Sequence, residues 1–121
     1  MKLEDAVKGM MDARNQLRTR RGVTDPFFIS EQMQRLSQYN GAVEEHLAVK
    51  EEELEVLEME KFTSYCKSKS VNQAEILTRY EVGSSKGEIA KLKRYVNSSW
   101  QIVSVAQSRF NHLKEESGNQ I

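Results

Sequence analysis

The sequence predicts an all-α protein, an elongated helical hairpin or bundle of two long and two shorter helices. Hydrophobic residues make up 38% of the chain and charged residues 30%, a balance typical of extended helices with narrow apolar stripes. Apolar residues recur at spacings of three and four, and no segment alternates with the period of two expected for a strand. The chain contains one proline and six glycines, so long stretches are free of helix breakers.

The first predicted element is a basic helix over residues 1–21. Leu3, Val7, Met10 and Leu17 follow one another at spacings that place them on one face of a helix. The opposite face is polar. Gly22 follows a run of arginines and is the residue at which we expect this helix to stop.

A long acidic helix is predicted over residues 25–68. Asp25 followed by Pro26 is typical of a helix cap with proline at the first helical position, although Ser30 is an equally good cap. Only Gly41 weakens the stretch that follows, which predicts roughly 35 to 40 helical residues and a length of about 55 Å. Its positions at coiled-coil spacing are Met33, Leu36, Asn40, Val43, Leu47, Lys50, Leu54 and Leu57.

Two further helices are predicted over residues 70–82 and 85–116. Ser70 with Gln73 forms a candidate capping box for the shorter one, which we expect Gly83 and the following serines to end. Ser85 with Glu88 forms a second capping box, and behind it lies the clearest heptad pattern in the chain. We therefore expect self-association through this last helix, by Ile89, Leu92, Val96, Val103, Ala106, Phe110 and Leu113, with Ser99 as the one polar position.

Length and composition predict one helical domain over residues 1–121, without an intramolecular disulfide. Cys66 is the only cysteine, and no apolar run has the length of a signal peptide or a membrane span. We therefore expect a cytoplasmic protein that does not enter membranes.

Charge is unevenly distributed along this neutral chain. Residues 1–21 hold six basic and three acidic side chains, residues 22–60 hold two and ten, and residues 61–114 hold ten and three. An acidic middle therefore lies between two basic flanks. The acidic run of residues 51–60 fits an ordinary solvated helix face. The alternative hypothesis is a docking face for a basic partner.

The sequence offers little for catalysis, and we predict that the protein is not an enzyme. The neutral-pH candidates His46, His112 and Cys66 lie in unrelated contexts. No metal-ligand spacing is present, and residues 83–87 lack the Gly-Lys-Ser/Thr ending of a phosphate-binding loop. We expect no metal and no cofactor.

Basic residues near aromatic ones are the more informative pattern, because cations hold a phosphate backbone and rings stack on bases. Solvated helix faces would explain the same charges. Trp100 fits a buried anchor or a stacking platform. The candidate residues for binding single-stranded DNA are Arg18, Arg20, Arg21, Tyr65, Lys67, Lys69, Lys86, Lys91, Lys93, Arg94 and Arg109.

Three segments together resemble the UvsY family of phage recombination mediators. They are the opening Met-Lys-Leu-Glu-Asp, the mid-chain helix with its Tyr39, His46-Leu47, Glu51 to Glu53, Leu57-Glu58, Lys61 and Tyr65, and the ending Ser108-Arg109-Phe110 with His112-Leu113-Lys114. The resemblance spans most of the chain as a pattern of helices and scattered matches.

The resemblance implies a small all-helical protein that forms a ring-like homo-oligomer and acts in DNA recombination, repair and replication. It would bind single-stranded DNA, help to remove single-strand binding protein and load a RecA-like recombinase, in the bacterial host cytoplasm if the protein is phage-encoded. The family's oligomerising region maps onto residues 89–113, and its basic site onto Lys67 and Lys69. The alternative is a non-enzymatic helical phage protein that acts only through protein contacts, as an assembly factor or an inhibitor of a host enzyme.

Overall fold

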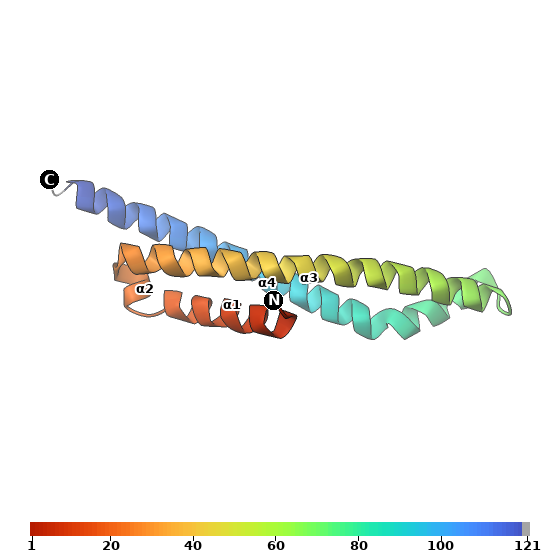
Figure 1. Ribbon diagram of the computed structural model, residues 1–121. Coiled ribbons are helices and arrows are strands. Elements are labelled where there is room, and N and C mark those ends of the chain that lie inside the picture. The colour runs from red at the N-terminus through yellow and green to blue at the C-terminus, as the bar shows by residue number, and fades with distance from the viewer. Residues whose placement is uncertain (120–121) are drawn as a thin grey trace. The chain divides into compact units, whose positions relative to one another are not determined.

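The fold is all-α, as the sequence predicts. The computed structural model describes residues 1–119, with side chains placed up to residue 117. Its helices are α1 (Leu3–Leu17), α2 (Arg21–Thr24), α3 (Pro26–Cys66) and α4 (Val71–Asn119), and none of the described residues forms a strand (Figure 1). The two long and two shorter helices are confirmed, but the second short helix is α2 and not residues 70–82.

Packing divides the chain into two units, each of which takes part of α3 and part of α4. The unit that we call the three-helix unit contains residues 1–44 and the C-terminal part of α4 from Tyr95 onwards. Its three main helical segments belong to α1, α3 and α4, and the four-residue α2 lies between the first two. The hairpin unit contains residues 45–94, which are the end of α3, a turn and the start of α4.

The three-helix unit has a fully buried core. On α1 the stripe of Ala6, Met10, Ala13 and Leu17 points inward, at the spacing of one helix face. From α3 and α4 come the buried side chains of Ile29, Leu36, Val43, Val96 and Ala106. Each large aliphatic side chain buried in this way contributes about 1.5 to 3 kcal/mol.

The end of α1 differs from the prediction, because the helix stops at Leu17 and Gly22 lies inside α2. Gly22 is buried against the backbone of Gln16 and Leu17, so closely that a Cβ atom would overlap both. Glycine is therefore required here for a close approach of two backbone segments and not as a helix stop.

The caps predicted at Asp25 and at Ser70 are confirmed, although the helix that Ser70 begins is the long α4 and not a short helix over residues 70–82. Asp25 Oδ1 accepts the backbone N–H of Phe27 at 3.1 Å and that of Phe28 at 3.3 Å, and Pro26 is the first residue of α3. At the start of α4, Ser70 Oγ accepts the N–H of Gln73 at 3.3 Å, and Gln73 Oε1 accepts that of Ser70 at 3.4 Å. Both caps satisfy N–H groups that have no partner within the helix.

The hairpin unit buries one side of each helix and little more. Leu47, Ala74, Val82 and Ile89 are its buried apolar residues, joined by Thr78, which donates its hydroxyl to the Ala74 carbonyl oxygen at 2.7 Å. The predicted seam residues Leu54 and Leu57 are only half-buried, as are Phe62, Leu77 and Leu92. Two packed helices leave much of this seam open to solvent.

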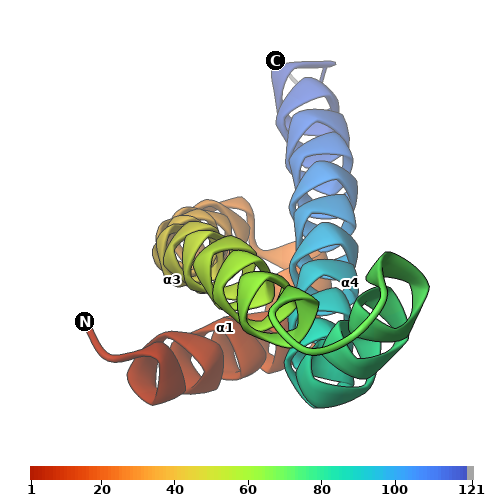
Figure 2. The same ribbon diagram turned by 90° about the vertical axis from the view of Figure 1, so that its right-hand side faces the viewer.

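The predicted break at Gly83 and the second capping box at Ser85 are wrong, because α4 runs through both without interruption. Each glycine in a helix interior costs about 1 kcal/mol relative to alanine. Val82 and Ile89 are buried on either side of this stretch, and their burial outweighs that cost. Figures 1 and 2 show α4 changing direction in its teal segment, which contains the glycines, as Gly/Ser stretches allow.

Candidate nucleic-acid interface

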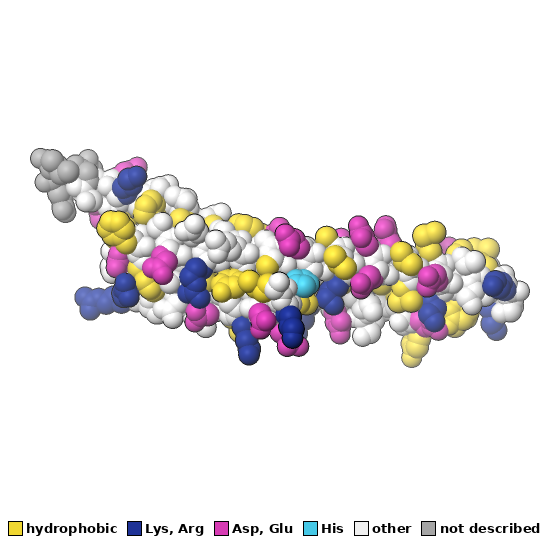
Figure 3. Space-filling view, in the orientation of Figure 1, with side chains coloured by type: hydrophobic (Ala, Val, Ile, Leu, Met, Phe, Trp, Pro, Cys, Tyr) yellow, Lys and Arg dark blue, Asp and Glu magenta, His cyan; other side chains and the backbone are white. Residues whose placement is uncertain are grey.

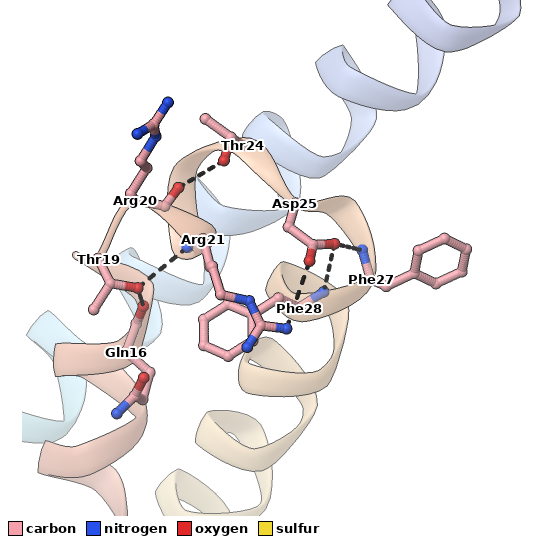
Figure 4. A network of polar contacts seen from close by, with 9 residues as sticks. Gln16, Thr19, Arg20, Arg21, Thr24, Asp25, Phe27 and Phe28 are labelled. Atoms are coloured by element: carbon pink, nitrogen blue, oxygen red, sulfur yellow. Dashed lines mark hydrogen bonds and ion pairs between the residues drawn. The ribbon is translucent and has the colours of Figure 1, made fainter.

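The chain turns between α1 and α3 through a corner that carries three arginines. We call Arg18, Arg20, Arg21 and Phe27 the arginine corner; all four belong to the three-helix unit and are exposed. The short helix α2 forms the middle of this turn (Figure 4).

Short-range hydrogen bonds hold the corner in shape. Thr19 donates its hydroxyl to the Gln16 carbonyl oxygen at 2.6 Å and accepts the N–H of Gly22 at 3.3 Å. Thr24 donates to the Arg20 carbonyl oxygen at 2.8 Å, and Asp25 caps α3. The backbone that carries the arginines is therefore ordered by side chains of its own turn.

The arginines of the corner are not equivalent. Arg21 lies 3.6 Å from the Asp25 carboxylate and stacks over the Phe28 ring, 4.3 Å from its centroid. Arg18 and Arg20 are exposed, and neither makes an ion pair with any described residue. These two arginines can therefore pair with an anionic partner without breaking an ion pair within the described residues.

Phe27 is an exposed aromatic side chain that the sequence analysis missed. Its side chain is 86% exposed, although Phe28 beside it is buried. Figure 4 shows Phe27 and Arg20 pointing out of the turn on different sides. The only sequence signal was an aromatic pair after the helix cap, of which a helix can bury one member and expose the other.

Arg109 belongs to the structure of the corner and not to its exposed surface. Its guanidinium group donates to the carbonyl oxygen of Gly22 at 2.9 Å and to that of Leu17 at 3.3 Å. These two acceptors lie at the end of α1 and within α2, where helix ends leave carbonyl groups without partners. Its role as a DNA ligand stays a prediction, and the structure adds that Nη1 of its guanidinium group is engaged within the protein.

The basic residues predicted in the hairpin unit fall into two sets. Lys86 lies 3.1 Å from Glu58 and Lys93 lies 2.8 Å from Glu51, so α3 carboxylates partly neutralise both. Lys67, Lys69, Lys91 and Arg94 are exposed and make no ion pair among the described residues. Figure 3 shows this alternation of acidic and basic side chains over the right-hand, hairpin end of the view.

The rings of Tyr65, Trp100 and Tyr95 contact carboxylates or cations of their own unit. Tyr65 donates its hydroxyl to Glu81, which raises the pKa of Tyr65 and lowers that of Glu81. Trp100 is half-buried and donates its indole N–H to Glu44, which favours the anchor over the stacking platform. Arg14 stacks over the Tyr95 ring at 4.6 Å. None of these three rings is as exposed as Phe27.

The residues predicted to oligomerise are partly used within the chain. Ile89 is buried in the hairpin unit, and Val96 and Ala106 are buried in the three-helix unit. Leu92, Val103, Phe110 and Leu113 are half-buried. The heptad period was correct, but much of the stripe that it marks packs against this chain's own helices.

Comparison with known proteins adds no relative. No family model, curated protein or solved structure matches the chain. Within residues 1–119, no cluster of three His, Cys, Asp or Glu side chains is placed to hold a metal ion. Among the described helices, none combines the length and the apolar character needed to cross a membrane.

Proposed function

We propose that the protein is a UvsY-like recombination mediator that binds single-stranded DNA as a homo-oligomer. In this role it helps to load a RecA-like recombinase onto strands covered by single-strand binding protein. The resemblance of three segments of the sequence to that family supports the proposal. The arginine corner is the part of the described structure whose chemistry fits it best.

One observation carries the DNA part of the proposal, namely cations without ion-pair partners beside an exposed ring on an ordered turn. Arg18 and Arg20 can contact phosphates, and Phe27 can stack on a base. A strand that uses both must pass over the corner, because Arg20 and Phe27 point to different sides of it (Figure 4). Lys67 and Lys69 remain a second, separate basic site in the hairpin unit.

Such binding is electrostatic and independent of base sequence, so its salt dependence reports the number of phosphate contacts. Each phosphate neutralised on a single strand contributes about 0.7 to the slope of log affinity against log salt. Replacing Arg18 and Arg20 by alanine should therefore reduce that slope by about 1.4 and weaken binding. Phe27→Ala should weaken binding by about 1 to 3 kcal/mol with an unchanged slope, because stacking releases no counterions.

The experiment is fluorescence anisotropy of a labelled oligo-dT strand, titrated with protein at several salt concentrations. Arg79→Ala is the matched control, since Arg79 is exposed, makes no ion pair among the described residues, lies outside the corner and is not one of the predicted DNA-binding residues. Lys67→Ala with Lys69→Ala tests the second basic site. Absence of binding at low salt contradicts the DNA proposal, and equal losses for Arg79→Ala and the corner variants contradict the location of the site.

A second candidate function is a protein-only role, favoured by the outward face of α3. Glu52, Glu53, Glu55 and Glu60 are exposed there and make no ion pair with any described residue. Exposed Val56 and Met59 lie among them. A basic protein partner, as expected for an assembly factor or an inhibitor, would dock on this face, and Glu52→Gln with Glu55→Gln would abolish that capture without changing binding of oligo-dT.

A further inference from the structure

Arg109 reaches the arginine corner from a distant part of the chain. It is half-buried on α4, and its Nη1 donates to the carbonyl oxygens of Gly22 at 2.9 Å and Leu17 at 3.3 Å. These two acceptors lie 87 and 92 residues away along the chain. The hydrogen bonds that Thr19 and Thr24 make in the same turn span only three or four residues. Arg109 therefore fixes the turn to another helix of the same unit, which local hydrogen bonds cannot do.

The two acceptors of Arg109 flank the basic segment of the corner, residues 18–21. Leu17 is the last residue of α1, where carbonyl groups lack helical partners and carry partial negative charge. Gly22 lies just beyond the segment, within α2. One guanidinium nitrogen thus holds both ends of the stretch that carries the three arginines of the corner.

This clamp leaves the charges of the segment available to a partner. Arg18 and Arg20 are exposed and make no ion pair among the described residues, whereas the bonds of Arg109 go to backbone oxygens only. A segment that is ordered in the free protein loses less conformational freedom when a strand binds, which raises affinity. Order matters here because a strand must reach these arginines and the ring of Phe27 at the same time.

We propose that Arg109 is a positioning residue for strand binding, which acts through residues 18–21 and does not itself contact a phosphate. The inference rests on the proposed function and names what holds that site in its binding geometry. It separates two roles that predict different salt dependence, because only a direct phosphate contact releases counterions.

The first test needs no DNA and uses limited digestion with trypsin, which cleaves after arginine and lysine. Arg109→Ala should speed cleavage within residues 18–21 about fivefold or more, because cleavage follows the population of the locally opened segment. Cleavage after Lys67 and Lys69, in the exposed turn of the hairpin unit, is the reference in the same sample and should not change. Unchanged cleavage within residues 18–21 overturns the proposal.

The second test is fluorescence anisotropy of labelled oligo-dT at several salt concentrations. Arg109→Ala should weaken binding about two- to tenfold, the cost of ordering the segment during binding. The slope of log affinity against log salt should stay unchanged, whereas loss of a direct phosphate contact would reduce it by about 0.7. Arg109→Lys keeps a charged donor and should restore part of both the affinity and the protection from trypsin.

Two further variants separate positioning from a general loss of stability. Leu36→Ala removes a fully buried side chain from the core of the same unit and leaves the contacts of the corner in place. Below its unfolding temperature it should bind oligo-dT with unchanged affinity. Thr19→Val removes the hydrogen bonds that Thr19 makes to Gln16 and Gly22, and it should weaken binding with an unchanged slope, as Arg109→Ala does.

The outcomes distinguish this inference from the proposed function. No binding by the wild-type chain at low salt overturns the proposed function and this inference with it. Binding by the wild-type chain with an unaffected Arg109→Ala overturns this inference alone. A slope reduced by about 0.7 in Arg109→Ala overturns it in favour of a direct phosphate contact, and an equal loss of affinity in Leu36→Ala overturns it in favour of general destabilisation.

Discussion

The two units of this chain use the same long helices in different ways. In the three-helix unit α1 covers the seam between α3 and α4, and Met10, Ile29, Leu36 and Val43 have no exposed surface. In the hairpin unit no third helix is present, and Leu54 and Leu57 stay half-buried. The addition of α1 therefore covers the apolar side of the α3–α4 pair and excludes solvent from it.

The two units also differ in the ion pairs that join their helices. Cross-helix ion pairs run along the hairpin unit, between Lys61 and Glu81, Lys86 and Glu58, and Lys93 and Glu51. Exposed pairs of this kind contribute about 0 to 1 kcal/mol each. In the three-helix unit Arg35 of α3 pairs with Asp12 of α1 at 3.0 Å, and more apolar side chains are buried than in the hairpin unit.

The largest effect should come from deleting core side chains of the three-helix unit. Ile29→Ala should lower the free energy of unfolding by about 2 to 5 kcal/mol, because Ile29 is fully buried and leaves a cavity. Leu57→Ala in the hairpin unit should cost less than half as much, since its side chain is half-exposed. Urea unfolding followed by circular dichroism measures both, and Trp100 fluorescence reports on the three-helix unit alone. Equal losses would mean that the hairpin seam is covered in solution.

The next effect concerns Arg109, whose guanidinium group donates to carbonyl oxygens of α1 and α2. Arg109→Ala should lower the free energy of unfolding by about 1.5 to 3 kcal/mol, because it leaves the carbonyl groups of Leu17 and Gly22 without their charged donor. Arg94→Ala should change stability by at most about 0.5 kcal/mol, as surface substitutions do. Thermal unfolding of both variants tests this. An unchanged unfolding midpoint for Arg109→Ala would mean that its hydrogen bonds to Leu17 and Gly22 do not stabilise the fold.

The sequence allowed prediction of features that depend on neighbouring residues. The Asp25 and Ser70 caps were predicted and are confirmed, because a cap and the N–H groups it binds lie within three residues of each other. The helix period of α4 was likewise correct. Buried Ile89 and Val96 lie on the predicted stripe.

Features that depend on distant residues could not be predicted in this way. The acceptors of Arg109 lie 87 and 92 residues away, so no local pattern separates it from an exposed arginine. The break at Gly83 was predicted from local propensity, which tertiary burial of Val82 and Ile89 overrides. A heptad period shows which residues pack, but not whether their partner belongs to the same chain.

A smaller effect, of opposite sign in the two units, is expected from replacing glycine by alanine. A Cβ atom at Gly9 would overlap the Tyr39 ring, so Gly9→Ala should cost about 1 to 3 kcal/mol through overpacking. Gly87→Ala meets no neighbour and should stabilise the hairpin unit by up to about 1 kcal/mol. Thermal unfolding at low protein concentration measures both. Stabilisation by Gly9→Ala would show that Tyr39 moves aside at no cost.

The smallest effect is a pH dependence confined to the hairpin unit. The Tyr65 hydroxyl is the main cause of the lowered pKa of Glu81, and Lys61 contributes less. A lowered folded-state pKa means that the contact stabilises above the unfolded-state pKa and is lost as pH falls through the folded value. The pKa of Tyr65 is raised by the same bond, so the contact is also lost as pH rises through that value.

Tyr65→Phe should therefore return the pKa of Glu81 towards its ordinary range, and Lys61→Gln should raise it by less. The stability difference between wild type and Tyr65→Phe should be greatest between about pH 5 and pH 9 and shrink on both sides. Carboxyl chemical shifts of Glu81, followed by NMR through acid titration, measure the first change directly. The side chains of Lys61 and Glu81 are both partly exposed to solvent, so high salt should screen the attraction between them. The hydrogen bond from Tyr65 should then remain the main cause of the lowered pKa of Glu81. A larger change in the pKa of Glu81 for Lys61→Gln than for Tyr65→Phe would contradict this prediction, because it would make the charge of Lys61 the main cause of the lowered pKa.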